Sequence, residues 1–210
     1  MKVVGLTGGI AAGKNFVATI FAQNGAAIFD ADAQVHNLLS SDEEIISKIG
    51  SLFPQSLLKQ GDNYKIDRKI LGKIAFEDAK KLKILEKIIH PEVRKKCHEF
   101  LVKAQKDKKE IAVLNIPLLL QNKGYKYDKI IAVIAPKSVR KKRFLTREKK
   151  INPINFEKEK NDLEKKFEQI SSKQISDSES RKHADFVVKS AISKSFTVLF
   201  VQKIITQILA

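Results

Sequence analysis

The stretch GGIAAGKNF, residues 8–16, carries the glycines and the lysine of a phosphate-binding loop. It matches the pattern G-x-x-x-x-G-K-[ST] as far as Lys14, and Asn15 stands where the pattern has Ser or Thr. Glycines let backbone N–H groups converge on phosphate oxygens, and Lys14 can reach the β- and γ-phosphates. The predicted nucleotide-binding residues of this stretch are Gly8, Gly9, Ile10, Ala11, Ala12, Gly13, Lys14, Asn15 and Phe16.

A metal ion at this loop would meet unusual ligands. A Ser or Thr hydroxyl after the lysine normally coordinates Mg²⁺, together with a carboxylate at the end of a buried strand. An amide oxygen can also ligate Mg²⁺, so Asn15 is a candidate metal ligand with longer reach and no charge. The best strand of that kind, EIAVLN, ends in Asn115, and Gln121 follows as a third amide. We therefore expect Mg²⁺ to depend on the nucleotide phosphates, on water and on Asp30 or Asp32.

Asp32 is the best candidate for catalysis. It follows the apolar run AAIFD, and a carboxylate just past the second strand of such a sheet faces the phosphate loop. There it can take the proton of an acceptor hydroxyl, or bind Mg²⁺ through water. Helix capping is the alternative for Asp30 and Asp32. A dinucleotide-binding fold, with Asp30 on a ribose, is disfavoured because G-x-G-x-x-G is absent and Lys14 would have no role.

Three arginines follow the fourth predicted strand on one predicted helix. Arg140, Arg143 and Arg147 are spaced i, i+3 and i+7, which places them on one face. Together they could clamp a phosphate during its transfer. The alternative is a solvated basic face without a ligand.

The order of elements around these residues predicts an α/β fold. KVVGL, the glycine loop, the helical spacing in KNFVATIFAQNG and the run AAIFDAD give the beginning of a doubly wound parallel sheet. EIAVLNIPLLL, DKIIAVIAP and ADFVV add three buried strands. Residues 35–110 are mainly helical, with a turn or short hairpin at GDNYK, an N-cap at Asp67 and a kink or break at Pro91.

The predicted organisation has three parts. A nucleotide-binding core comprises residues 1–34, 111–139 and 184–210, a helical lobe comprises residues 35–110, and residues 140–183 form a basic helix and a charged helix. The apolar segment FTVLFVQKIITQILA is too short for a membrane span and is interrupted by polar residues, so we expect a docked amphipathic helix.

The composition is that of a globular enzyme with an anionic partner. The net charge is +16, from 40 basic and 24 acidic residues, and one interpretation is a nucleic-acid partner. Aromatic residues are 7% with no Trp, so a platform for stacking bases is not evident and we expect no specific nucleic acid. The start MKVVGLTGG runs directly into a strand, so no signal peptide is expected. The single cysteine and the four histidines lack zinc spacing, and a reducing cytoplasm is the simplest location.

Taken together, these residues resemble the dephospho-CoA kinase family over nearly the whole chain. The resemblance rests on VGLTGGIAAGK, DAD followed by His36, GDNYKIDRKILGKIAF, LEKIIHPEVR, IPLLL, the R-x-x-x-R of Arg143 and Arg147, and Gln174, Arg181, Ala184 and Asp185. The glycine loop alone would fit many kinases. The His-Pro segment and DRKILGKIAF are far more specific.

The resemblance implies a P-loop NTPase-type three-layer fold with an inserted helical substrate lobe at 35–110 and a helical lid at 140–183. It implies transfer of the ATP γ-phosphate to the ribose 3′-hydroxyl of dephospho-CoA, by a monomer or weak homo-oligomer without membrane partners. Lys14 would bind phosphate, Asp32 would be the base or the metal-organising carboxylate, and Arg143 or Arg140 would be the lid arginine. The other implied ligands of nucleotide or substrate are Arg147, His36, Arg68, His90 and Arg94.

The sequence departs from the family pattern at four places. The loop reads AAGKNF instead of a Gly-Ser-Gly-Lys-Ser-Thr ending, Asn115 and Gln121 replace acidic residues, and Lys189-Ser190 replaces a polar ending after ADFVV. The alternative hypothesis is therefore a nucleotide- or CoA-binding protein with weakened or lost catalysis. A switch GTPase is disfavoured, because QNKGYKYD lacks the Asp of N-K-x-D.

Overall fold

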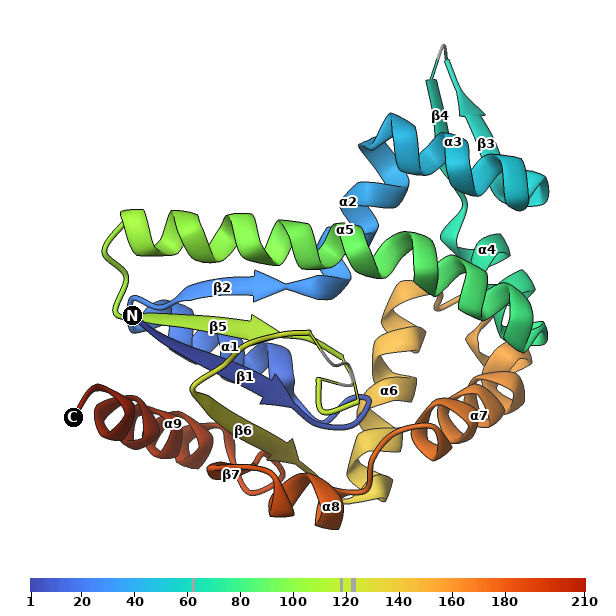
Figure 1. Cartoon of the computed structure of the whole chain (residues 1–210). Coiled ribbons are helices and arrows are strands. Elements are labelled where there is room, and N and C mark those ends of the chain that lie inside the picture. The colour runs from blue at the N-terminus through green and yellow to red at the C-terminus, as the bar shows by residue number, and fades with distance from the viewer. Residues whose placement is uncertain (62, 118, 122–123) are drawn as a thin grey trace. The chain divides into compact units, whose positions relative to one another are not determined.

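A computed structural model of the chain describes residues 1–61, 63–117, 119–121 and 124–210. The chain divides into two compact units, one of Met1–Phe29 with Ala104–Ala210 and the other of Asp30–Lys103. Figure 1 labels the helices and strands of both units along the chain. The second unit and the predicted lobe, 35–110, overlap over most of their length.

The first unit is built on a five-stranded sheet with the strand order β2-β5-β1-β6-β7. The strands are β1 (Lys2–Thr7), β2 (Ala27–Asp30), β5 (Ile111–Asn115), β6 (Lys129–Ile134) and β7 (Phe186–Lys189). β1 pairs in parallel with β5 and β6, and β6 pairs in parallel with β7. Every residue of β5 is buried, as expected for a central strand of a parallel sheet. The predicted parallel α/β fold is confirmed.

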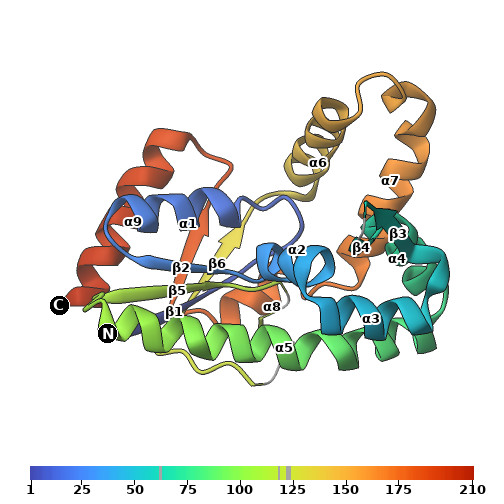
Figure 2. The same cartoon turned by 90° about the horizontal axis from the view of Figure 1, so that it is seen from above.

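Two helices from opposite ends of the chain close one side of this sheet. The helices of the first unit are α1 (Lys14–Gln23), α6 (Lys137–Ile151), α7 (Phe156–Ser172), α8 (Asp177–Lys182) and α9 (Lys194–Leu209). α1 and α9 lie side by side (Figure 2), and Phe21, Val201 and Ile204 of these helices share a core with Val4 and Val133 of the strands. The apolar C-terminal segment is therefore a docked helix. Within the described residues, no helix is long and apolar enough to span a membrane.

α6 and α7 form an antiparallel pair held by aromatic and ionic contacts. The rings of Phe144 and Phe167 are both buried, with centroids 5.7 Å apart. Lys141 of α6 approaches Glu164 of α7 to 2.7 Å, which lowers the pKa of that carboxyl group. The ion pair is only partly buried and adds little by itself, so the buried rings do most to hold the two helices together.

The second unit is helical with one small hairpin. Its elements are α2 (Ala31–Ser41), α3 (Glu43–Leu52), the 3₁₀ helix η1 (Pro54–Ser56), β3 (Leu57–Gln60), β4 (Asn63–Ile66), α4 (Arg68–Glu77) and most of α5 (Ala79–Lys106). β3 and β4 pair antiparallel, so the predicted hairpin is confirmed, although Asp62 of GDNYK lies outside the described residues. Asp67 accepts hydrogen bonds from the amides of Lys69 and Ile70, at 2.8 and 3.1 Å, and caps α4 as predicted.

A kink or a break was predicted at Pro91: the break is wrong, and the kink stays a prediction. α5 continues through the proline for 28 residues. Proline removes one helical hydrogen bond and crowds the preceding turn. Ile89, Val93 and Cys97 recur every fourth residue around that point and are all buried, so the apolar stripe of this helix outweighs the local cost.

Two aspartates tie the sheet together just before their strands begin. Asp128 accepts from the amide of Val3 at 2.7 Å and donates its own amide to the Val3 carbonyl. Asp185 has the same reciprocal arrangement with Ile130, and its other oxygen lies 3.0 Å from Lys129 Nζ. Partial burial raises the pKa of Asp185, but the hydrogen bonds from Ile130 and Lys129 lower it by more, so the net shift is downward.

We expect the Asp185→Asn change to destabilise the fold in a pH-dependent way. The pKa of Asp185 is lower in the folded state than in the unfolded state, so its stabilisation is present above about pH 4 and is lost as the pH falls further. Because the side chain is 37% exposed, the loss of unfolding free energy at pH 7 should be only about 0.5–1 kcal/mol. Urea unfolding at pH 7 and pH 3 measures this, with Asp162→Asn as an exposed control; an equal difference at both pH values would contradict it.

Candidate active site

The phosphate-loop pattern occupies the turn between β1 and α1. Gly8 has φ 146°, and a Cβ there would lie 2.3 Å from the carbonyl oxygen of Val133, so only glycine fits. Gly13, with φ 102°, is the N-cap of α1, and Lys14 is the first residue of that helix. Lys14 Nζ donates to the Gly8 carbonyl at 2.8 Å. The loop therefore places an ammonium group and the positive end of a helix at one point, which suits an anion.

Ala11 takes a strained conformation within the loop. Its φ is 56°, in the left-handed region where a Cβ costs about 1–2 kcal/mol. Such a residue persists only where its surroundings hold it in place. The contacts around Ala12, the next residue, supply that support.

Ser190, Arg143 and Ala12 form a hydrogen-bonded node behind the loop. Ser190 is 8% exposed, and its hydroxyl donates to the Ala12 carbonyl at 2.5 Å. Arg143 donates through Nη1 to Ser190 Oγ at 2.9 Å and through Nη2 to the Ser190 carbonyl at 2.7 Å. A further contact of 3.4 Å runs from Nη1 to the Ala12 carbonyl. The node connects the loop, α6 and the end of β7.

A second pair of side chains supports the opposite part of the loop. Gln174 Oε1 accepts from the backbone N–H of Ile10 at 2.7 Å. Arg140 is buried and donates through Nε to the Ala135 carbonyl at 3.1 Å. Its Nη1 lies 2.4 Å from the point where a Cβ on Gly9 would be, so the guanidinium group reaches the loop backbone.

The three arginines of α6 do not act alike. Arg140 and Arg143 both reach the phosphate loop. Arg147 is exposed, lies 3.1 Å from Glu148 and has its guanidinium carbon 5.4 Å from the centre of the Phe144 ring. Of the three arginines predicted to clamp a phosphate, Arg140 and Arg143 therefore lie at the loop, and Arg147 lies on the exposed surface of α6.

Asn15 is hydrogen-bonded to the other amide singled out in the sequence. Nδ2 of Asn115 donates to Oδ1 of Asn15 at 3.0 Å. Asn115 ends β5 and is 4% exposed, whereas Asn15 is exposed in the first turn of α1. Gln121 is exposed and donates to the Lys173 carbonyl at 3.3 Å, so it is not a member of this pair.

The predicted substrate residues belong to the second unit. Asp30 caps α2, accepting from the Ala33 amide at 3.1 Å, so the capping alternative holds for Asp30. Asp32 and His36 lie one turn apart on the same helix. Arg68 begins α4, and His90 and Arg94 lie one turn apart on α5. The binding roles of these residues remain predictions.

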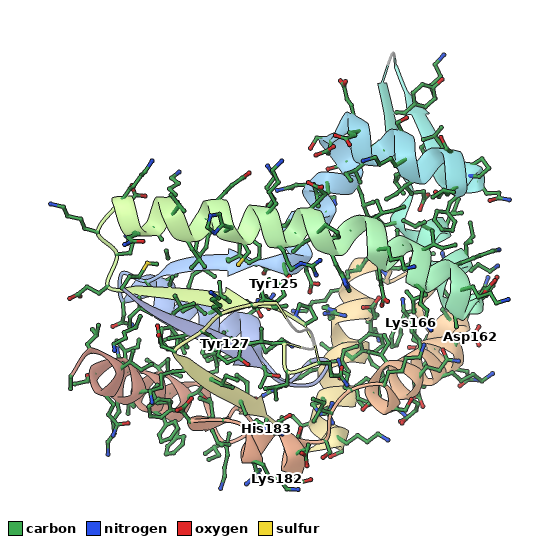
Figure 3. The ribbon with its side chains drawn as sticks, in the orientation of Figure 1. Tyr125, Tyr127, Asp162, Lys166, Lys182 and His183 are labelled. Carbon is green, nitrogen blue, oxygen red and sulfur yellow. The ribbon has the colours of Figure 1, made fainter. Side chains whose placement is uncertain are left out.

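The Cys97 thiol and the side chains around Glu179 could also carry chemistry, and the structure gives each of them a structural role. Burial raises the pKa of the Cys97 thiol to about 11, so it stays protonated at neutral pH. Lys182 and His183, labelled in Figure 3, both contact Glu179 and lower the pKa of its carboxyl group. In the part of the chain that the structure describes, no cluster of three or more His, Cys, Asp or Glu side chains could hold a metal.

Sequence reasoning underestimates Ser190 and Gln174. In the sequence, Ser190 stands out only as a departure from a family pattern, and Gln174 only as a motif position. Both contact the loop from more than 160 residues away in the sequence, and no local spacing indicates such a contact. The predicted IPLLL motif includes Leu118, and QNKGYKYD includes Asn122 and Lys123, which lie outside the described residues.

A parallel sheet whose first strand leads into this glycine–lysine loop defines a P-loop kinase-type site. The family model for dephospho-CoA kinase matches residues 2–194. The dephospho-CoA kinase of Bartonella quintana is 42% identical over 191 residues, covering 90% of this chain and 89% of that protein. That of Bartonella henselae is 39% identical over 207 residues and covers 97% of each chain.

Two solved structures are also similar to this chain over nearly its whole length. The dephospho-CoA kinase from Campylobacter jejuni is 31% identical, with a TM-score of 0.61, over 99% of this chain and 97% of that chain. The protein TT1252 from Thermus thermophilus is 26% identical, with a TM-score of 0.74, over 100% of this chain and 98% of that chain. The chain belongs to the dephospho-CoA kinase family. The resemblance predicted from the sequence is confirmed.

We expect Ser190→Ala to weaken ATP binding about tenfold. Removing the hydroxyl takes away the hydrogen bond to Ala12 and one bond from Arg143, and a buried group without its partner costs about 1–3 kcal/mol. Isothermal titration calorimetry with ATP measures the change. Ser51→Ala is the matched control, since that exposed hydroxyl donates to the Ser47 carbonyl of its own helix, away from the loop. Equal affinities of the Ser190→Ala variant and the native protein would contradict the role of the node.

Proposed function

We propose that this protein transfers the γ-phosphate of ATP to the ribose 3′-hydroxyl of dephospho-CoA. The family activity is phosphorylation of dephospho-CoA to coenzyme A, and the chain is a transferase of this kinase family. The observation that carries the proposal is the phosphate loop, in which Lys14 donates to the Gly8 carbonyl, Arg143 and Gln174 bond to the backbone, and Arg140 lies beside Gly9. The comparisons give no support to the alternative of a binding protein without catalysis.

In this proposal the loop binds and orients the donor. Backbone N–H groups of the loop other than those of Ile10 and Ala12, which donate to Gln174 and Gly9, surround the β- and γ-phosphates. Lys14 exchanges the Gly8 carbonyl for a phosphate oxygen. Arg143 and Arg140 add positive charge beside the transferred group, and Arg147 contributes from farther along α6. The basic excess of the chain, +16, suits two substrates that each carry several negative charges.

Asp32 is the proposed base. The ribose 3′-oxygen attacks the γ-phosphorus, the bond from that phosphorus to the β,γ-bridging oxygen breaks, and the hydroxyl proton passes to the Asp32 carboxylate. Asp30 caps α2, and Asp32 is the carboxylate of DAD to which the resemblance gives this role. His36, Arg68, His90 and Arg94 are proposed to bind the CoA part of the acceptor.

Magnesium would enter with the nucleotide. Mg²⁺, when bound, neutralises charge that develops on the phosphates. The loop residues do not fit a metal held directly by the protein, because the group that Asn115 directs toward Asn15 is an N–H donor rather than a ligand oxygen. We also propose a monomer or weak homo-oligomer in the cytoplasm, with no specific nucleic-acid or membrane partner.

We expect purified protein with ATP, Mg²⁺ and dephospho-CoA to form coenzyme A and ADP in equal amounts, measured by mass spectrometry. Asp32→Asn keeps the shape of the side chain but removes the base, so the turnover number should fall at least about 100-fold. Asp42→Asn is the matched control, an aspartate that caps α3. Unchanged turnover in Asp32→Asn would reject Asp32 as the base, and ATP binding without coenzyme A formation would reject the proposed transfer.

A further inference from the structure

Two neutral amides occupy the positions where a phosphate loop of this type usually provides an oxygen-rich metal site. Asn15 follows Lys14 at the beginning of α1, and Asn115 ends the neighbouring strand β5. In P-loop NTPases a hydroxyl and a carboxylate at such positions hold Mg²⁺ directly. Here the two side chains are bonded to one another, Asn115 Nδ2 to Asn15 Oδ1, at 3.0 Å.

The direction of this hydrogen bond determines what the pair can bind. A side-chain amide has one acceptor oxygen and two N–H donors. Asn15 turns its oxygen toward Asn115, so the other polar end of its side chain is an amide nitrogen. N–H groups carry partial positive charge, which repels a cation and attracts a phosphate oxygen.

The burial of Asn115 fixes the pair in this arrangement. Asn115 is 4% exposed and lies in a strand whose residues are all buried, so its amide is held by the sheet. Asn15 lies at the exposed beginning of a helix, where the positive end of the helix also favours an anion. The buried partner therefore orients the exposed one.

We propose that Asn115 is a positioning residue for Asn15, and that this amide pair makes nucleotide binding by the loop nearly independent of Mg²⁺. Asn15 adds a donor to the phosphate cradle, and the metal reaches the site bound to the phosphates and water without a ligand from the loop. The inference rests on the proposed use of ATP, but it concerns binding rather than transfer.

The test is calorimetric titration of a non-hydrolysable ATP analogue, once with excess MgCl₂ and once with EDTA. For the native protein we expect the two dissociation constants to agree within about threefold. In the double variant Asn15→Thr/Asn115→Asp, which has the usual hydroxyl and carboxylate, the constant in EDTA should exceed that in Mg²⁺ at least tenfold. The new carboxylate repels metal-free phosphates and binds Mg²⁺ when it is present.

Three further proteins make the test specific. Asn15→Thr alone should remain nearly metal-independent, because the amide of Asn115 persists, and Asn115→Asp alone should fall between the native and double variants. Gln202→Glu adds the same charge at an exposed position of α9 and should behave as the native protein. The buried carboxylate introduced by Asn115→Asp could prevent folding. In that case the dissociation constants of the native protein and of Asn15→Thr, each measured with MgCl₂ and with EDTA, still test the proposal.

The outcomes separate this inference from the proposed function. A native protein that binds the analogue at least tenfold more tightly with Mg²⁺ than with EDTA overturns the inference and leaves the kinase proposal intact. A double variant without metal dependence also overturns it. A native protein that binds the analogue in neither buffer overturns both proposals.

Discussion

The phosphate loop depends on holding a strained backbone in one shape by contacts from behind. A loop that presents N–H groups to an anion cannot satisfy them within a helix or a sheet, and here it also contains Ala11 at φ 56°. The node of Ser190, Arg143 and Ala12 supplies the missing constraint, together with the bond from Ile10 to Gln174. These partners come from β7, α6 and the segment after α7. The order of the sheet and the packing of α6 thus have a direct consequence for the site.

The arginines of α6 show how one helix can serve two purposes. A guanidinium group offers five donors in a fixed plane. Arg143 uses two of its nitrogens on Ser190 and the loop, which fixes both its own position and that of the backbone it contacts. In the proposed reaction, a positive charge placed in this way would need little reorganisation when charge develops on a phosphate. Arg147, with Glu148 and the ring of Phe144, has the character of a surface residue.

The sequence was sufficient for the class of fold and for the place of the loop, because both have local signals. Apolar runs that end in glycine predicted β1 and the loop, and Asp67 was recognisable as a cap from its position before an apolar helix. The node was not predictable in this way. A serine after a short strand has no periodicity or motif of its own, and it acquires its role only when the fold brings β7 and α6 to the loop. The break expected at Pro91 was wrong for the converse reason, because the burial of the residues around the proline outweighed a local rule.

Asn15 and Asn115 illustrate why departures from a motif are better considered in pairs. Taken singly, each amide looks like the loss of a metal ligand. The structure places them in contact, and each amide complements the other: a hydroxyl beside Asn115, or a carboxylate beside Asn15, would change the hydrogen-bonding requirements of its partner. The loop keeps its glycines, its lysine and its supports, and these suit an anion with or without a metal. In the proposed arrangement, the amide pair leaves the base of the loop without a negative charge, so the loop binds metal-free and metal-bound nucleotide about equally.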